Sequence, residues 1–404
     1  MDELIAKLKP DFLRSKTILV LSPQSWGRML ISKHHYALEL AKRGNRVYYL
    51  NPPENDRWSL RDAKSRITIS SLPENENLFL VQQKLYFPYL LKFHSRPVYN
   101  FLIKKQIRDI LGVINTPIDI VWSFDLGNLF PLRFFHDKFI KVFHPVDEPR
   151  DRHEILSGAG ADILFSVTRE IIGKFAFCGV PSHFINHGLP DEFLAEEPGR
   201  SNKNGPLQTG MSGNLVRPDL DRKTLLQIIH ENPDIIFNFY GSYTAGHSNI
   251  GAAEDEETHA FIQTLLELKN VRLHGVLGTV DLARELNRMD VLLICYDIKL
   301  DQSKGTNYHK VMEYLSTGKV IVSNNITTYQ EYPNMICMVA SRSDNAGLPR
   351  LFKETINQID QYNSDELMQE RRAFAHNNTY RKQLDRISEL MKQANNGISK
   401  NFAG

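Results

Sequence analysis

The stretch of sequence that decides the fold is KGTNYHKVMEYLSTGKVIVSNN, residues 304–325. Four apolar residues recur there at i, i+3, i+4 and i+7, which predicts one buried helix face. They are Tyr308, Val311, Met312 and Leu315. Gly318 stands where a helix commonly ends, and KVIVS at 319–323 has the pattern of a fully buried strand. A helix leading directly into such a strand predicts a parallel α/β sheet.

A polar stripe on another face of this helix points to a ligand. Gly305 and Thr306 are predicted to open the helix, with Thr306 as its N-cap. Lys310 then adds a full charge to the partial positive charge of the helix N-terminus, which suits a phosphate or diphosphate. Glu313 lies nearly one turn further on, where it would accept hydrogen bonds from sugar hydroxyls. The alternative is a core helix whose charged residues are simply solvated.

The chain before this stretch reads as a βαβ unit followed by further strands. Residues 17–22 and 46–50 are predicted strands joined by a helix, which implies a parallel sheet. Ligands bind beyond the carboxyl ends of such strands, so Trp26, Gly27 and Arg28 in the first loop are candidates. An amphipathic helix is predicted at 1–16, and further strands are predicted at 118–125, 139–144, 161–168 and 182–189.

Two acid–base candidates follow the strand at 139–144. His144 and Asp147 stand at its carboxyl end, where a substrate would come within hydrogen-bond reach. The alternative for His144 is a structural histidine.

A second domain begins after a segment rich in Gly, Pro, Asn and charge at 194–206. Five more strands with helices between them predict a second Rossmann-like domain. Two such domains in tandem would place two crevices opposite one another across an inter-domain cleft, one for a nucleotide and one for a second substrate. Domain closure would exclude water.

Composition excludes several classes of protein. The 404 residues carry a formal net charge of +2, which gives no global reason to expect nucleic acid binding. The 3 cysteines are too few and scattered for a disulfide framework or zinc site. The first sixteen residues lack an apolar signal core, and no apolar run approaches the roughly 18 residues that a membrane span needs. We therefore expect a cytoplasmic protein, soluble or peripheral to the inner face of the plasma membrane.

Residues 84–108 differ from their surroundings because basic and aromatic residues alternate there with no acidic residue. This composition is typical of a surface that lies on anionic lipid or meets a lipid-linked ligand. The alternative is a partly buried helix pair whose lysines extend along it to solvent.

The run HKVMEYLSTGKVIVSNN resembles the donor-binding signature of GT-B glycosyltransferases of the bacterial surface-polysaccharide type, close to the retaining family-4 group. RVYYLNPP, INHGLPDEF, MSGN and RLHGVLGTVDLARELNRMDVLLICY resemble other family segments in the same order. FAHNNTYRKQL resembles the terminal helix that returns to the first domain. The resemblance implies an α/β GT-B fold, with an acceptor domain at 1–200, a donor domain at 206–375, and a helix at about 376–395 packed on the acceptor domain.

The resemblance also implies the roles of individual residues. Glu313 would hold the ribose, Lys310 with Arg217 or Arg222 would neutralise the leaving diphosphate, and His144 would lie near the transferred sugar. The nucleotide-sugar site would comprise Gly213, Asn214, Arg217, Gly241, Ser242, Val276, Leu277, Thr306, Asn307, Lys310 and Glu313. The donor would be a nucleotide-diphosphate sugar, with UDP or GDP the commonest nucleotides in the family.

One departure from the family pattern concerns a carboxylate. Retaining members usually have two glutamates eight positions apart, and the first would fall at Gly305. Asp147 or Asp125 could supply a carboxylate instead. The Asp219-Leu220-Asp221 triplet matches a D-x-D metal motif, but Asp221 is better explained as a helix cap, so we expect no metal and no cofactor.

The resemblance thus implies a metal-independent hexosyltransferase-type enzyme of cell-surface polysaccharide synthesis, which transfers a sugar to a glycan or lipid-linked acceptor. Two alternatives stay open: a GT-B sugar-nucleotide epimerase, and a catalytically silent nucleotide-sugar-binding scaffold.

Overall fold

The computed structural model describes residues 11–27, 30–53, 66–195, 205–244, 255–301 and 303–401. The chain divides into two compact units, Met1–Asn186 with Tyr380–Gly404 (unit 1) and His187–Thr379 (unit 2). The predicted helix at 1–16 lies largely outside the described residues, and Arg28 lies outside them entirely.

Unit 1 is built on an eight-stranded sheet with strand order β3-β4-β2-β1-β5-β6-β7-β8 among the described residues. Its strands are β1 (Thr17–Leu21), β2 (Arg46–Leu50), β3 (Arg66–Leu72), β4 (Asn75–Lys84), β5 (Ile120–Ser123), β6 (Ile140–Phe143), β7 (Ile163–Ser166) and β8 (Ser182–Phe184). Its helices are α2 (Ser32–Lys42), α3 (Leu91–His94), α4 (Arg96–Ile114), α5 (Arg152–Ile155), α6 (Arg169–Lys174) and α14 (Tyr380–Asn401). Neighbouring strands are parallel except for β3 and β4, which form an antiparallel hairpin.

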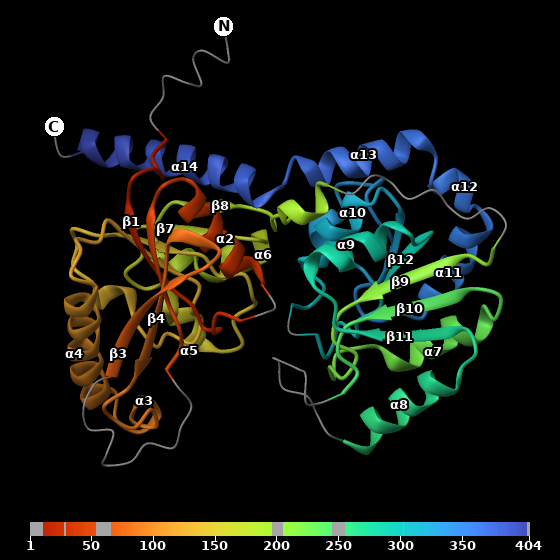
Figure 1. Cartoon of the computed structure of the whole chain (residues 1–404), viewed down its shortest axis with the longest axis horizontal. Coiled ribbons are helices and arrows are strands. Elements are labelled where there is room, and N and C mark those ends of the chain that lie inside the picture. Colours follow the sequence, from red (N-terminus) through yellow and green to blue (C-terminus); the bar gives the residue numbers. More distant parts are fainter. Residues whose placement is uncertain are drawn as a thin grey trace, which may run out of the picture. The chain divides into compact units, whose positions relative to one another are not determined.

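The unit 1 sheet is covered on both faces, which explains the continuous apolar runs of its central strands. One core lies between the sheet and helices α2 and α14, and the other lies beneath α4 (Figure 1). The start of α2 is capped from within the helix, because the N–H of Ile31 donates to Nδ1 of His34 at 3.0 Å. Burial lowers the pKa of His34 to about 4, so this ring is neutral and its Nδ1 is free to accept.

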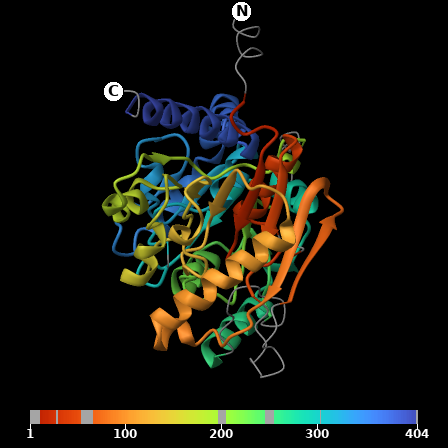
Figure 2. The ribbon, with the colours of Figure 1, turned by 90° about the vertical axis from the view of Figure 1, so that its left-hand side faces the viewer.

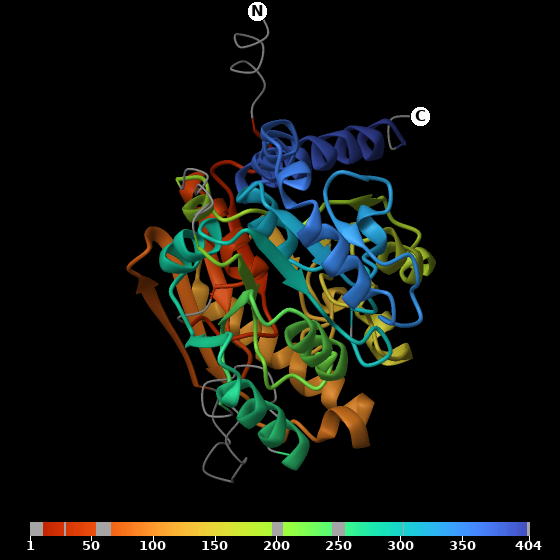
Figure 3. The same ribbon diagram turned by 90° about the vertical axis from the view of Figure 1, so that its right-hand side faces the viewer.

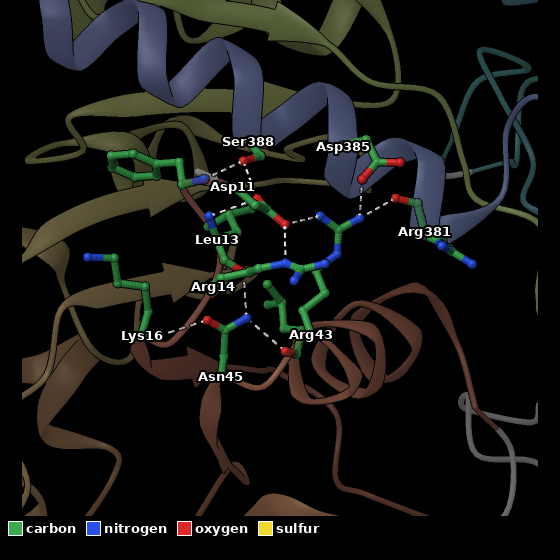
Figure 4. Close-up of polar contacts among 11 residues, drawn as sticks. Asp11, Leu13, Arg14, Lys16, Arg43, Asn45, Arg381, Asp385 and Ser388 are labelled. Atoms are coloured by element: carbon green, nitrogen blue, oxygen red, sulfur yellow. Dashed lines mark hydrogen bonds and ion pairs between the residues drawn. The ribbon is translucent and has the colours of Figure 1, made fainter. Parts of the chain in front are cut away.

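The C-terminal helix α14 is fastened to the N-terminal part of unit 1 by a polar network around Arg43 (Figure 4). The Arg43 guanidinium donates to Asp11 at 3.1 Å, to Asp385 at 2.7 Å and to the carbonyl of Arg381 at 2.6 Å. The Ser388 hydroxyl donates to Asp11 at 2.5 Å. These bonds link three segments that are far apart in sequence and hold α14 beside α2.

The outer edge of the unit 1 sheet is the β3–β4 hairpin, and α4 lies across the outside of the same unit (Figure 2). The apolar face of α4 is buried beneath the sheet, with Tyr99, Ile103, Ile107 and Ile110 at most 3% exposed. Its other face carries the exposed basic residues Lys104, Lys105 and Arg108.

Unit 2 is built on a six-stranded parallel sheet with strand order β11-β10-β9-β12-β13-β14 among the described residues. The strands are β9 (Gln208–Ser212), β10 (Ile236–Tyr240), β11 (Val271–Gly275), β12 (Val291–Ile294), β13 (Val320–Ser323) and β14 (Cys337–Met338). The helices are α7 (Arg222–Glu231), α8 (Glu256–Glu267), α9 (Thr279–Asn287), α10 (Lys310–Ser316), α11 (Leu348–Asn357), α12 (Ile359–Tyr362) and α13 (Asp365–His376).

The strand order of unit 2 reverses at β9, which places helices on both faces of the sheet. Helix α11 packs against α7, and α13 packs against α10, consistent with α7, α8 and α11 on one face and α9, α10 and α13 on the other (Figures 1 and 3). The prediction of a parallel α/β unit here is confirmed, although the short edge strand β14 was not predicted.

The helix in the stretch 304–325 begins later than predicted. It starts at Lys310 with His309 as N-cap, and Gly305, Thr306 and Tyr308 belong to the loop before it. The prediction that Thr306 caps this helix is therefore wrong. The helix end is as predicted, since Gly318 follows it with a φ of +78°.

Candidate functional site

The carboxyl ends of β9, β10 and β11 bring three predicted loops together at one edge of the unit 2 sheet. The N–H of Gly213 donates to the carbonyl of Tyr240 at 2.8 Å, and the N–H of Gly241 donates to the carbonyl of Gly275 at 2.7 Å. A Cβ on Gly241, whose φ is +150°, would lie 2.0 Å from the Gly213 carbonyl oxygen. Only glycine permits this approach of the two turns.

Helix α10 is fixed to the end of β9 by two of its side chains. Strand β9 pairs with β12 only through Thr209 and Gly210, so Ser212 lies beyond that pairing. There the N–H of Ser212 donates to the hydroxyl of Tyr314 at 2.6 Å, and Nζ of Lys310 donates to the carbonyl of Ser212 at 2.5 Å. The helix thus completes the backbone hydrogen bonding of the strand end.

Lys310 and Arg217 form a pair of cations around the ring of Tyr296. Nζ of Lys310 donates to the Tyr296 hydroxyl at 2.6 Å and lies 4.9 Å from the ring centroid. The Arg217 guanidinium lies 5.5 Å from the same centroid. A Cβ on Gly213 would lie 2.7 Å from the Lys310 Nζ, so the glycine turn lies directly against this cation.

Asp219 holds Arg217 in place. Nε of Arg217 donates to Asp219 at 2.7 Å, and a terminal guanidinium nitrogen donates to the second carboxylate oxygen. Burial lowers the pKa of Arg217, but the Asp219 carboxylate outweighs that effect and the net pKa is raised. The Arg217 side chain is 29% exposed and Asp219 only 5%, so the guanidinium keeps further N–H donors for a ligand.

The segment that carries Arg217 is braced against the segment that carries Tyr296. Leu220 and Tyr296 form an antiparallel bridge, and the N–H of Asp297 donates to the carbonyl of Asp219 at 2.9 Å. Asp221 caps α7 by accepting from the N–H of Thr224 at 3.0 Å. This confirms the predicted capping role of Asp221.

Of the two arginines proposed for the diphosphate, only Arg217 lies at this cluster. Arg222 belongs to α7, where it donates to the Thr258 hydroxyl at 2.6 Å and lies 3.6 Å from the Glu257 carboxylate. It lies 5.5 Å from the ring centroid of Phe261 on α8.

The loop before α10 is organised by Asp301. Its carboxylate accepts from the N–H of Gly305 at 2.9 Å, from the Tyr308 hydroxyl at 2.7 Å and from Ser303. Gly305 has a φ of +65°, and a Cβ there would lie 2.7 Å from the carbonyl oxygen of Asn325. A glutamate at 305 would therefore clash with the backbone in this loop.

Glu313 and Lys310 have shifted pKa values because both lie in a poorly solvated environment. Burial raises the pKa of Glu313 to about 7, although Lys310 opposes this. Burial lowers the pKa of Lys310. The Glu313 side chain is half-buried rather than enclosed, so a ligand can reach its carboxylate.

The other predicted site residues of unit 2 lie in the same loops. Val276 is 48% exposed, Leu277 is half-buried, and Asn214 accepts from the N–H of Val216 at 3.0 Å. The hydroxyls of Ser242 and Thr306 donate to carbonyls of their own loops. Asn307 is 5% exposed in the Asp301 loop. The exposed Val276 and the half-buried Leu277 offer apolar surface that suits a flat base. Thr306 acts mainly within its loop.

The two predicted acid–base residues lie in unit 1. His144 is fully buried among Tyr36, Trp122, Phe124 and Phe165, with ring centroids 5.0–6.1 Å away. Burial lowers its pKa to about 3, so the ring is neutral. This environment favours the structural alternative, and the catalytic role of His144 stays a prediction.

Asp147 has a different environment from His144. Its side chain is 55% exposed, and its carboxylate lies 3.5 Å from Nζ of the buried Lys33. Its role as a base also stays a prediction. Asp125 is less suited to that role, because its carboxylate accepts from the N–H of Leu129 at 2.7 Å and closes its own loop.

Within the described ranges, no three His, Cys, Asp or Glu side chains gather as ligands for a metal ion. Both carboxylates of the D-x-D triplet are engaged, one with Arg217 and one as a helix cap.

Tyr296, Tyr314 and Asp219 were not predicted as site residues. Tyr296 follows a buried strand directly, so its position at the carboxyl end was a usable signal. The roles of Tyr314 and Asp219 depend on side-chain hydrogen bonds across 102 and 2 residues, for which the sequence pattern gives no sign.

Comparison with solved structures shows the class of fold. The sucrose-phosphate synthase of Thermosynechococcus elongatus superposes with a TM-score of 0.66 at 12% identity, covering 94% of this chain and 98% of that one. The HepE protein of Anabaena in complex with UDP and glucose gives 0.62 at 12% identity, covering 93% and 99%. The lipopolysaccharide outer core galactosyltransferase WaaB gives 0.58 at 11% identity, again covering 93% and 99%.

These neighbours are GT-B proteins matched over nearly their whole length, so the chain has the GT-B fold and the predicted fold class is confirmed. No protein-family model matches the sequence, and no curated protein matches it.

Proposed function

We propose that this protein is a glycosyltransferase that takes a sugar from a nucleotide-diphosphate sugar bound at the carboxyl edge of the unit 2 sheet. The observation that carries the proposal is the arrangement of Lys310 and Arg217 around Tyr296, beside the Gly213 turn and one helical turn from Glu313. The two cations would neutralise the diphosphate, and the glycine turn would let it come close to the backbone. The accessible Glu313 carboxylate would accept hydrogen bonds from the ribose hydroxyls.

The physical demand of the reaction supports this assignment. When the bond between the sugar and the diphosphate breaks, negative charge accumulates on the leaving nucleoside diphosphate. Lys310 uses two N–H donors on Ser212 and Tyr296, which leaves a third for a phosphate oxygen. Arg217 is oriented by Asp219 with donors remaining, so both cations are positioned before the substrate arrives.

We further propose that the reaction needs no bound metal and no cofactor. The carboxylates of Asp219 and Asp221 are already occupied by Arg217 and by the start of α7. Charge neutralisation then falls to Lys310 and Arg217. The solved structure of HepE with UDP and glucose supports a UDP sugar as the donor here, with GDP as the alternative.

The acceptor we propose is a glycan or lipid-linked sugar in cell-surface polysaccharide synthesis, at the cytoplasmic face of the membrane. The likeness in fold to the lipopolysaccharide galactosyltransferase WaaB and the basic–aromatic segment 84–108 support this choice. Asp147 in unit 1 would serve as the base for the acceptor hydroxyl.

Calorimetric titration of the purified protein with UDP, GDP, ADP and CMP, with and without magnesium, tests the donor site. Selective binding of one nucleoside diphosphate without magnesium is expected. Arg217→Met should weaken it about 10- to 100-fold, since hydrogen bonds to charged groups contribute about 1.5–3 kcal/mol. Arg222→Met is the matched control and should leave affinity unchanged. Binding of none of the four nucleotides would refute the proposal.

A second candidate is a nucleotide-sugar-binding scaffold without turnover. The observation that favours it is Gly305, where the family's first glutamate is absent and the loop geometry excludes it. Incubation of the protein with the nucleotide sugar it binds and a panel of glycan and lipid-linked acceptors separates the two. Sugar transfer or donor hydrolysis that Arg217→Met abolishes would exclude the scaffold.

A further inference from the structure

Exposed apolar side chains are concentrated in one short part of unit 1. Of the thirteen large apolar side chains that are exposed among the described residues, five lie between positions 89 and 101. The most exposed of these are Leu90 at 63%, Phe93 at 62% and Phe101 at 71%. Only Ser95 separates the end of α3 from the start of α4, so the two helices are neighbours in one part of unit 1 (Figures 1 and 2).

The basic residues of α4 continue the same surface. Phe101, Lys104, Lys105 and Arg108 recur at i, i+3, i+4 and i+7, which places them on one helix face. All four are exposed, whereas the opposite face of α4 is buried in the core. The surface formed by Leu90, Phe93, Phe101, Lys104, Lys105 and Arg108 is named here the α3–α4 surface.

The structure separates the two explanations of segment 84–108. Phe87 and Tyr99 are 3% exposed and Lys92 is 5% exposed, so part of the segment is core. Lys104 also fits that alternative, because its Nζ lies 4.8 Å from the ring centroid of Phe134 and its side chain therefore extends along apolar surface. The alternative does not account for Leu90, Phe93 and Phe101, whose apolar side chains are each more than 60% exposed.

We propose that the α3–α4 surface docks the protein on an anionic lipid bilayer, with Leu90, Phe93 and Phe101 in the interfacial region and Lys104 and Arg108 against acidic headgroups. A bilayer is favoured over a protein partner by charge complementarity, because Lys104, Lys105 and Arg108 on this helix face have one acidic neighbour, Asp109, which pairs with Lys105 at 2.6 Å. Exposed aromatic and aliphatic side chains beside basic residues are the composition of interfacial helices. Among the described residues no helix is long and apolar enough to span the bilayer.

This inference deepens the proposed function by naming the surface through which a lipid-linked acceptor would be reached. It does not depend on nucleotide binding for its test.

Co-sedimentation of the full-length protein with lipid vesicles tests the proposal. Vesicles of phosphatidylcholine with phosphatidylglycerol should bind the protein, vesicles of phosphatidylcholine alone should bind it weakly, and added salt should weaken binding. Lys104→Gln with Arg108→Gln should lower the partition coefficient about 25-fold, since each charge near the surface contributes about fivefold. Phe93→Ser with Phe101→Ser should also lower it at least tenfold, at every salt concentration.

The controls are matched in residue type and exposure. Phe177 is 53% exposed and Lys138 is exposed in unit 1, and neither belongs to the α3–α4 surface. Phe177→Ser and Lys138→Gln should leave vesicle binding unchanged. An unchanged far-UV circular dichroism spectrum and unchanged thermal unfolding of every variant show that unit 1 remains folded.

Three outcomes would overturn the proposal. The first is that the wild type does not bind phosphatidylglycerol vesicles. The second is that both double variants bind these vesicles as tightly as the wild type does. In the third, Phe93→Ser with Phe101→Ser changes the sedimentation coefficient of the protein but not vesicle binding, which would make the surface a contact between two copies. Each can occur while nucleotide binding stands.

Discussion

Removing the hydroxyl of Tyr314 tests how helix α10 is joined to the sheet. Both Tyr314 and Ser212 are buried, at 0% and 4% exposure, and the Ser212 N–H donates to this hydroxyl at 2.6 Å. The Ser212 hydroxyl donates to it at 3.1 Å. In Tyr314→Phe the Ser212 N–H stays buried without an acceptor, which costs about 1–3 kcal/mol. We therefore expect unit 2 to lose about 2 kcal/mol of stability.

Hydrogen exchange read by mass spectrometry in increasing urea measures this loss for unit 2 separately. The amides of β9 should exchange faster in Tyr314→Phe, by about 30-fold for 2 kcal/mol. The matched control is Tyr36→Phe in unit 1, because the Tyr36 side chain is 1% exposed and its hydroxyl has no hydrogen-bond partner among the described residues. That variant should be neutral or slightly stabilised. Equal effects of the two substitutions would refute the reasoning.

Three further predictions concern charge and capping. The pKa of Glu313 is raised from 4.5 to about 7, so the folded state binds the extra proton and the free energy of unfolding should fall as pH rises from about 4.5 to 7. The fall should be limited to about 1–2 kcal/mol because the side chain is partly exposed. Urea titrations at a series of pH values should show it in the wild type but not in Glu313→Gln. The same dependence of the unfolding free energy on pH in both proteins would contradict the prediction. Asp221→Ala should cost about 1–2 kcal/mol through loss of the α7 cap, measured by hydrogen exchange in α7, and unchanged α7 protection would exclude this role. Arg43→Met should cost about 1–2 kcal/mol and lessen the salt sensitivity of thermal unfolding, since two ion pairs with Asp11 and Asp385 are lost; an unchanged melting temperature would show that the apolar face of α14 suffices.

The GT-B fold could be predicted because its central strands are buried on both faces. The strand 291–294, for example, is apolar and buried throughout. The β3–β4 hairpin was not predicted because β3 lies at the sheet edge with mostly exposed residues. An edge strand lacks the continuous apolar pattern that identified the others.

The start of α10 shows where sequence pattern is insufficient. Thr306 is a good capping residue, but Asp301 accepts from the N–H of Gly305 and from Tyr308, which turns the chain before the helix begins. Helix α10 therefore has only seven residues, and its macrodipole contributes less to anion binding than a longer helix would. The anion-binding capacity of the site depends instead on Lys310 and Arg217.

The positions where strands end predicted which residues lie at the unit 2 site. They did not predict which side chains hold those residues in place. Gly213, Gly241 and Lys310 were predicted and lie together, because the loops after parallel strands meet at one edge. Tyr296 and Asp219 orient the two cations through side-chain contacts, and such partners are set by three-dimensional packing. The position of His144 after a strand likewise gave no sign that its ring lies in an aromatic core.

A crystal structure of the protein with the nucleoside diphosphate that binds most tightly tests the central claim most directly. The account predicts diphosphate oxygens within hydrogen-bond distance of Lys310 Nζ and the Arg217 guanidinium, ribose hydroxyls on Glu313, and the base against Val276 and Leu277. A nucleotide bound elsewhere on the chain, with Lys310 and Arg217 contacting only Ser212, Tyr296 and Asp219 as they do here, would contradict it.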